Sequence, residues 1–363
     1  MKLIFDGHLD LAWNALSWNR DLTESVRQLR HREAAMSQPA RKCVTTSLPE
    51  MRKARVAVCL GTLLARAKRN VCPSTGHLRT DLDHGTRVIA CAITQGQLAY
   101  YRLLENRREM LLIRDSKQLS AHWKKWKSRK TKSHPIGLIL SMEGADPIIA
   151  PSQVEAWWSD GLRVVGMAHY GQCAYACGTG KAGPLTAEGR ELLREFKHCG
   201  MILDMTHLSE PGFFEALDHF AGRVLASHNN CRALVPGDRQ FSDEQIRLLI
   251  KRNAVIGSVM DAWMLHPGWV AGRTSRKVVG LEAVADHMDH ICQLAGNANH
   301  VAIGSDLDGG FGADQCPRDL ETIVDLHKLE PILKKRGYRE EDIVAIFHGN
   351  WLRFFLEALP RDG

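Results

Sequence analysis

The sequence predicts an α/β fold of the (β/α)8-barrel (TIM-barrel) type, organised as a single domain over residues 1–363. Eight short apolar runs alternate with helix-like stretches, and a strand–helix alternation repeated eight times is what such a barrel requires. The runs are continuously apolar, which is typical of parallel strands that are buried on both faces. They start at Leu3, Val56, Ile136, Leu162, Gly200, Val224, Ala254 and His300.

The helix-like stretches carry recognisable start signals. Ser209 precedes Glu210 and Pro211, as an N-cap does, and Ser242 stands three residues before Gln245, as in a capping box. The tail, residues 349–360, is expected to be an aromatic-rich helix that packs back on the barrel. Further helices are expected over residues 92–114, 151–160, 186–198, 280–294 and 319–336, and loops over 75–87 and 170–184.

The formal net charge of +7 comes largely from two basic stretches, residues 20–69 and 117–132. An excess of basic residues allows a nucleic-acid partner. In the second stretch, Trp123 and Trp126 alternate with lysines, as aromatic and basic residues do in proteins that bind single-stranded nucleic acid. However, no nucleic-acid motif accompanies these stretches, and they lie outside the strand ends. We therefore expect no nucleic-acid partner, and we interpret residues 117–132 as a solvated connector whose tryptophans pack on the barrel.

Targeting signals are not evident in the chain. The N-terminal residues lack the apolar region of a signal peptide, and no apolar window reaches the length of a membrane span. The ten cysteines are scattered, and several lie in apolar runs, as reduced core thiols do. These features predict a cytoplasmic protein with no membrane partner. Cys173 and Cys177 are weak candidates for metal ligands, because their surroundings are typical of a loop.

Metal-binding side chains follow the apolar runs at the places where the strands should end. In a barrel, the active-site loops follow the C-terminal ends of the strands. His8 and Asp10 are two residues apart, so on a strand both side chains point the same way. Six of the eight runs end in such groups, a bias that chance or core packing does not readily produce. The other runs contribute Glu143, His169, His207, His228 and Asp306.

Each histidine alone is more often a structural residue than a ligand, but the set together predicts a divalent metal centre. Imidazole and carboxylate ligands without thiolate suit zinc, or a related divalent ion, in a catalytic site with open positions. Two histidine–carboxylate sets joined by one shared carboxylate would hold two ions. We expect a metal-dependent hydrolase with two divalent ions, Zn²⁺ being favoured, in which a bridging hydroxide attacks the substrate carbonyl.

The ordered set of motifs resembles the membrane dipeptidase (renal dipeptidase) family, the M19 metallopeptidases. The motifs run in family order from residue 6 to residue 354, so the resemblance covers nearly the whole chain. No single motif is decisive, whereas the ordered set is specific. The motifs are DGHLD, MEGADPI, MAHYGQ, DMTHLS, SHNNCRA, DRQFSDEQI, GSDLDG and GNWLRF.

The resemblance implies zinc-dependent hydrolysis of dipeptides, including those with a D-residue at the second position. It implies that His8 and Asp10 bind one zinc ion and that His207 and His228 bind the other. Glu143 corresponds to the carboxylate that bridges both ions.

The same resemblance implies roles for three further residues. His169 corresponds to the histidine that contacts the substrate near the scissile bond, and Asp306 to the aspartate that assists proton transfer. Arg239 corresponds to the arginine whose planar fork pairs with the substrate carboxylate. From the residues alone, a surface salt bridge remained an alternative for Arg239.

Other functions remain open at this point. Barrel enzymes that open lactones or hydrolyse phosphotriesters use similar strand-end ligands, but a carboxylated lysine commonly bridges their metals. Here Glu143 stands in the bridging place and no lysine closes any run. A related hydrolase acting on another amide, lactone or ester is the alternative, and a non-catalytic binding barrel would be expected to lack ligands.

The chain also departs from the family pattern. Asn229 stands where relatives commonly have serine, and the second run with its basic loop fits the pattern poorly, although that loop should border the substrate cleft. Substrate specificity is therefore the least determined property. Relatives are often dimers, and aromatic helices at 152–158 or 350–355 offer either a homodimer interface or ordinary packing on the barrel.

Overall fold

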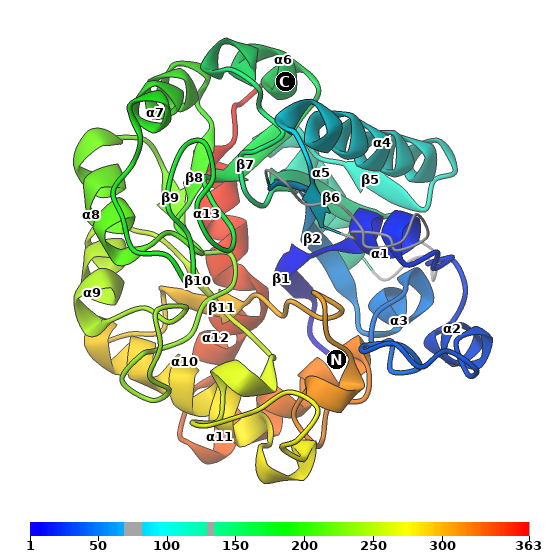
Figure 1. Cartoon of the computed structure of the whole chain (residues 1–363). Helices are drawn as coiled ribbons and strands as arrows, with labels where there is room; N and C mark the ends of the chain where they lie inside the picture. Colours follow the sequence, from blue (N-terminus) through cyan, green and yellow to red (C-terminus); the bar gives the residue numbers. More distant parts are fainter. Residues whose placement is uncertain (69–81, 129–133, 363) are drawn as a thin grey trace.

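The structure, a computed structural model, describes residues 1–68, 82–128 and 134–362. Its central strands form a ring with helices around the outside, so the chain is a (β/α)8 barrel, as predicted (Figure 1). Each of the eight apolar runs contains one barrel strand. These strands are β1 (Ile4–Leu9), β2 (Val56–Leu63), β6 (Ile136–Met142), β7 (Leu162–Gly166), β8 (Ile202–Asp204), β9 (Val224–Leu225), β10 (Ile256–Ser258) and β11 (Val301–Ile303).

Parallel pairing orders six of these strands as β1-β2-β6-β7-β8-β9, and β10 pairs with β11. A bridge between Ala226 and Ile256 connects the end of β9 to β10. The ring closes where β11 lies beside β1, and the backbone N–H of Asp306 donates to the carbonyl of His8 at 3.3 Å. Because all eight strands are parallel, their C-terminal ends meet at one mouth of the barrel.

Two glycines allow the last three strands to approach one another closely. A Cβ atom at Gly257 would lie 2.0 Å from the carbonyl oxygen of Ser227, and one at Gly304 would lie 1.9 Å from the same atom. Any side chain at either position would therefore push the strands apart. Glycine at these two positions therefore lets β10 and β11 pack against the residues that follow β9.

The helices cover the outside of the ring (Figure 1). Ser209 caps α8, and Ser242 forms a capping box with Gln245 at the start of α9, as predicted. No helix among the described residues is both long and apolar enough to cross a membrane. The helices are α1 (Leu11–Ser17), α2 (Val26–Arg32), α3 (Leu48–Lys53), α4 (Arg87–Asn106), α5 (Ser116–Lys127), α6 (Val154–Ser159), α7 (Ala187–Cys199), α8 (Glu210–His219), α9 (Asp243–Lys251), α10 (Leu281–Ala295), α11 (Leu329–Lys335), α12 (Glu340–Val344) and α13 (Asn350–Ala358).

Three predicted helices have other bounds in the structure, and one of them, expected over 151–160, is divided into a 3-10 segment, Pro151–Gln153, and α6. The helix expected over 92–114 is α4, which starts earlier and ends at Asn106, because Arg108 adopts a positive φ of 58°. The following apolar residues form the short strand β5 (Met110–Leu112), which pairs with the start of β6. The helix expected over 319–336 is divided into a 3-10 segment, Ile323–Lys328, and α11.

The basic stretch interpreted as a connector is mostly the helix α5. Asp115 caps it by accepting a hydrogen bond from the backbone of Gln118. Trp123 and Trp126 are buried, as expected, and the indole of Trp126 donates to the carbonyl of Pro135 at 3.0 Å. Residues 129–132 of this stretch, and 75–81 of the first expected loop, lie outside the described residues. The second expected loop, 170–184, is irregular as predicted.

The C-terminal helix α13 packs back on the barrel, as predicted. The Trp351 indole donates to the carbonyl of Ile303 at 2.9 Å, and the ring of Phe355 stacks on that of Phe5 at 5.3 Å between centroids. These aromatic side chains, like Trp157 on α6, are buried against the protein's own core. These three side chains therefore pack within the protein, and the homodimer stays a prediction.

Several arginines of the first basic stretch form ion pairs within the chain. The buried carboxylate of Glu33 lies 2.8 Å from Nε of Arg20 and 2.9 Å from Nη1 of Arg41. Arg52 pairs with Glu109 at 2.5 Å. These ion pairs hold three arginines of the stretch within the fold, while the formal net charge of the chain stays at +7.

Candidate metal centre

The predicted ligands meet at the mouth of the barrel, around the carboxylate of Glu143. Its Oε1 lies 3.1 Å from Nε2 of His207 and 3.2 Å from Nε2 of His228. Its Oε2 lies 3.6 Å from Nε2 of His8, which is also 3.6 Å from Oδ2 of Asp10. The two oxygens of Glu143 therefore face two different sets of donors.

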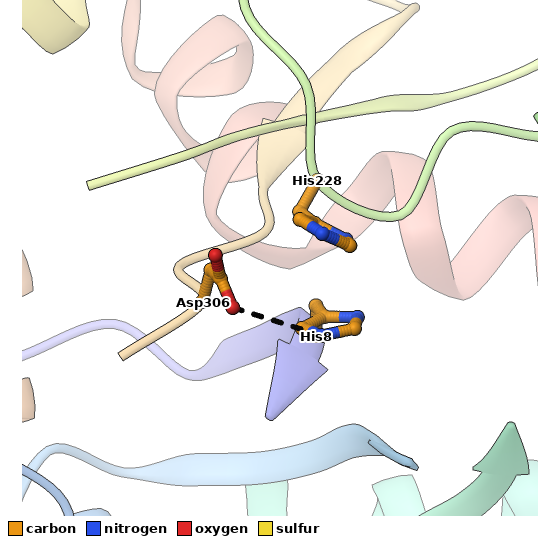
Figure 2. Close-up of side chains that lie close together, drawn as sticks. All are labelled: His8, His228 and Asp306. Carbon is orange, nitrogen blue, oxygen red and sulfur yellow. Dashed lines mark ion pairs between the residues drawn. The ribbon is translucent and has the colours of Figure 1, made fainter. Parts of the chain in front are cut away.

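Asp306 completes the cluster from the last strand of the barrel. Figure 2 shows the carboxylate of Asp306 directed at His8, and its Oδ1 lies 3.7 Å from Nε2 of His8. The ring of His228 lies over that of His8, with 3.7 Å between the ring centroids. Asp306 and His207 have positive φ angles of 57° and 67°. Such conformations are uncommon for residues other than glycine, and they place both side chains toward the centre of the mouth.

Neighbouring hydroxyl groups orient three of the potential metal-binding side chains. Nδ1 of His207 lies 2.9 Å from Oγ1 of Thr179, and Nδ1 of His228 lies 2.8 Å from Oγ of Ser227. A hydroxyl that accepts the Nδ1 proton leaves the Nε2 lone pair free for a metal. The hydroxyl of Thr62 donates to Asp10 on the other side of the cluster.

Two buried aspartates inside the strands hold the strand ends in place. Asp6 accepts hydrogen bonds from the backbone N–H of His8 at 3.2 Å and of Ser305 at 2.8 Å, so it joins β1 to β11. Asp204 similarly accepts from the N–H groups of Thr206 at 3.0 Å and Ser227 at 3.1 Å. Sequence reasoning missed both, although each stands two residues before a polar residue of a strand end.

Burial and neighbouring charges shift the pKa values of the histidines and carboxylates in the cluster. Burial opposes the charge on His8, but the carboxylates of Glu143, Asp10 and Asp306 outweigh it and raise its pKa to about 10. Burial raises the pKa of Glu143 to about 7 and that of Asp306 well above its usual range. Burial, followed by the charge of Arg239, lowers the pKa of His207 well below its usual value.

These properties fit bound cations. The buried carboxylates of Asp10 and Glu143 and the half-buried one of Asp306 lie around His8, whose buried Nε2 atom has no hydrogen-bond partner among the described residues. Divalent ions would neutralise this excess of negative charge and use the orphaned nitrogen. The potential ligand atoms form three overlapping groups, each within 4.8 Å: His8, His228 and Asp306; Glu143, His207 and His228; and His8, Asp10 and Glu143.

A cavity opens above the cluster and contains about 410 Å³ of space, including its opening to solvent. Arg239 lines it and is only 3% exposed, so the alternative of a surface salt bridge was wrong. Its Nη2 donates to the carbonyl of His228 at 3.1 Å, whereas its buried Nη1 has no partner among the described residues. The Asn229 side chain holds this segment, because it accepts from the N–H of Phe241 at 3.2 Å and donates to the Arg239 carbonyl at 3.3 Å.

Sequence reasoning also missed two charged residues near the cavity. Arg66 follows the second apolar run and approaches His169, and Asp261 follows the seventh and lines the cavity. Asp261 accepts from the backbone of Trp263 and the side chain of Gln315, and burial raises its pKa to about 7. Asp261 directly follows the seventh apolar run, so the search for carboxylates and histidines at run ends could have found it, whereas Arg66 is not a metal-binding residue type.

Cys173 and Cys177 belong to no potential metal cluster within residues 1–68, 82–128 and 134–362. The Cys173 sulfur instead lies 3.2 Å from the carbonyl of Met167 and accepts from the N–H groups of Tyr175 and Ala176. Its role is therefore to hold a loop beside the site.

In this barrel, histidines and carboxylates from the strand ends lie together beneath a cavity. This arrangement is that of a metal-dependent hydrolase. The sequence profile of the membrane dipeptidase family (peptidase family M19) matches residues 1–359, and the chain belongs to this family of metallopeptidases, which hydrolyse peptide bonds.

Relatives in sequence and structure agree with this assignment. The "Uncharacterized protein in pqqA 5'region" of Klebsiella pneumoniae is 26% identical over 60% of this chain and 80% of its own length. The dipeptidase tcpJ of Claviceps purpurea is 29% identical over 54% of this chain, but the match spans only 45% of that relative. A metallopeptidase from Rhodobacter sphaeroides, solved with a phosphinate mimic of the dipeptide L-Ala-D-Ala, is 21% identical with a TM-score of 0.77, covering 99% of this chain and 100% of its own.

Proposed function

We propose that the protein hydrolyses dipeptides with two divalent metal ions, Zn²⁺ being favoured, and that its substrates carry a free C-terminal carboxylate. The observation that carries this proposal is the position of Glu143, whose two oxygens face separate donor sets. Across the same cavity, Arg239 presents a buried guanidinium nitrogen that lacks a partner among the described residues. A cavity with a metal centre and one buried arginine suits a small anionic substrate.

The proposed ligands divide between the oxygens of Glu143. His8 and Asp10 would hold one ion, His207 and His228 the other, and Glu143 would bridge them. Bound divalent ions supply Lewis acidity and lower the pKa of water, so that hydroxide is available near neutral pH. The nitrogen and oxygen donors, with no thiolate among them, favour zinc over softer ions.

The remaining residues bind the substrate and move protons. Arg239 pairs with the terminal carboxylate and so fixes the peptide bond over the centre. His169, whose Nε2 lies 3.8 Å from Oε1 of Glu143, donates a hydrogen bond to the carbonyl oxygen of the scissile bond. Asp306 takes the proton from the attacking water and delivers it to the leaving amine.

The proposed substrates include dipeptides with a D-residue at the second position. The Rhodobacter sphaeroides structure contains a mimic of L-Ala-D-Ala, and this supports testing L–D dipeptides beside L–L dipeptides. The cytoplasmic location, the single-domain organisation and the homodimer remain predictions.

The direct test is hydrolysis of a panel of L–L and L–D dipeptides by the purified protein, before and after chelation and after zinc is restored. We expect cleavage that is lost with the metal and regained with zinc. Cleavage of lactones, esters or other amides in place of dipeptides would support the alternative, a related hydrolase built on the same centre. Dipeptide hydrolysis that chelation leaves unchanged would contradict the proposal.

A further inference from the structure

A short parallel ribbon places a guanidinium against the outer side of His169. The ribbon consists of β3 (Arg66–Ala67) and β4 (Asp83–His84). Arg66 pairs with Asp83 through two contacts, Nε to Oδ1 at 2.6 Å and Nη2 to Oδ2 at 2.9 Å. The third nitrogen, Nη1, lies 3.2 Å from Nδ1 of His169.

This contact determines which nitrogen of His169 carries the proton. A guanidinium has five N–H donors, accepts no hydrogen bond and does not lose its proton in proteins. Nδ1 of His169 must therefore be the acceptor, which requires it to be unprotonated. The proton of the neutral ring then resides on Nε2, the nitrogen that faces Glu143 and the cavity.

The other two histidines beside Glu143 have a different arrangement. Nδ1 of His207 and Nδ1 of His228 contact hydroxyl groups, which can accept a proton and leave Nε2 as a free ligand atom. His169 alone among the three contacts an obligatory donor at Nδ1. His169 thus differs from both in its Nδ1 partner, and it belongs to none of the groups of potential ligands among the described residues.

We propose that Arg66, held by Asp83, is a positioning residue that fixes His169 as a neutral ring with its proton on Nε2. In this state His169 presents an N–H group to the oxygen of the scissile carbonyl and cannot serve as a metal ligand. This inference deepens the proposed function and rests on it for the role of His169, whereas the tautomer itself is independent of any activity.

The surroundings of the pair agree with a fixed position. The backbone N–H of Arg66 donates to the carbonyl of Leu82 at 2.8 Å, and the N–H of Ala67 donates to Asp146 at 2.8 Å. The backbone carbonyl of His169 accepts from Thr179 at 3.0 Å, and its ring meets that of His207 edge to face at 4.4 Å. Both partners of the contact are thus anchored independently of substrate.

The tautomer can be measured directly by NMR on the zinc-loaded protein with ¹⁵N-labelled histidine rings. Two-bond ¹⁵N–¹H correlations distinguish a ring protonated at Nε2 from one protonated at Nδ1. The His169 signals are those that disappear in His169→Gln. We expect the Nε2–H pattern in the wild-type protein, and an Nδ1–H pattern or an imidazolium there would overturn the inference without any variant of Arg66.

Two variants of Arg66 then test the positioning role. Arg66→Met removes every donor, and we expect a mixed tautomer signal and a fall in kcat of about 10- to 100-fold with little change in KM. Arg66→Lys keeps a hydrogen-bond donor and should restore part of the Nε2–H signal and part of kcat. Asp83→Asn loosens Arg66 without replacing it, so its kcat and its tautomer signal should lie between those of wild type and Arg66→Met.

A matched control separates positioning from general destabilisation. Arg52 forms a comparable ion pair with Glu109, with side-chain exposures of 23% and 29% against 15% and 30% for Arg66 and Asp83. Arg52→Met should leave the His169 signals and kcat unchanged. Unaltered His169 signals and kcat within about twofold of wild type in Arg66→Met would overturn the inference. If the wild-type protein cleaved no dipeptide, the proposed function would fail, while the spectra would still decide the tautomer.

Discussion

Nε2 of His207 lies 3.1 Å from Oε1 of Glu143, while Oε2 of the same carboxylate lies 3.6 Å from Nε2 of His8. One side chain thus lies between two sets of metal-binding side chains that are about 200 residues apart in the sequence. Glu143, the residue after the third apolar run, is therefore the point at which both donor sets meet.

The substitution Glu143→Gln should weaken both metal ions at once, because a neutral amide bridges two cations poorly. We expect the loss of affinity to exceed the 10- to 100-fold that is roughly typical of removing a group behind a ligand. Metal content by mass spectrometry measures it, and Glu188→Gln, which breaks an ion pair with Arg87 away from the cluster, is the control. Full occupancy in Glu143→Gln would show that this carboxylate bridges nothing.

Asp306→Asn should retain metal but slow turnover by about 10²- to 10⁴-fold, since an amide cannot accept the proton of the attacking water. Steady-state kinetics combined with metal analysis of the same sample makes the comparison. Retained metal with unchanged turnover would remove the proton-transfer role. Lost metal would instead make Asp306 a ligand beside His8 and His228, with which it forms one potential binding group.

Replacing Arg239 should affect recognition of the terminal carboxylate specifically. Wild type should lose about 2 kcal/mol, or about 30-fold in kcat/KM, when a dipeptide is replaced by its C-terminal amide. Arg239→Met should discriminate little between the two substrates, whereas the exposed-site control Arg247→Met should behave as wild type. Equal discrimination in Arg239→Met and wild type would place carboxylate recognition elsewhere.

The protein should lose stability in mild acid because of a buried histidine on α5. Burial lowers the pKa of His122 from its ordinary value near 6.5 to about 4, and its Nε2 lies 2.9 Å from the carbonyl oxygen of Ala57. Between these two pH values the unfolded chain binds a proton that the folded chain does not. The contribution is therefore complete above pH 6.5 and decreases as the pH falls, by up to about 2 kcal/mol at pH 5.

Denaturant unfolding at pH 7 and pH 5 tests this linkage in His122→Gln, which keeps a donor for Ala57 but cannot titrate. We expect a smaller acid-dependent loss of unfolding free energy than in wild type. His31→Gln, at an exposed position on α2, controls for the effect of acid on the metal centre. A loss in His122→Gln equal to that of the control would contradict the assignment.

The strand ends could be predicted from the sequence because apolar runs and chemistry-bearing residues alternate along the chain. Glu143 and the histidines each follow such a run directly, so position alone identified them. The role of Arg66 could not be predicted, since it depends on a two-residue ribbon that brings position 66 to position 169. Similarly, β5 escaped detection because pairing with β6 overrides the helical spacing of Met110 and its neighbours.

The central claim is that two divalent ions, bridged by Glu143, make the protein a dipeptidase. The most direct measurement is to strip the protein of metal, titrate it with zinc, and record bound metal and dipeptide hydrolysis in the same samples. We expect activity to return with bound zinc and to saturate near two ions per chain, with chelation reversing it. Hydrolysis that persists in the stripped protein, or saturation of both sites without any dipeptide cleavage, would contradict it.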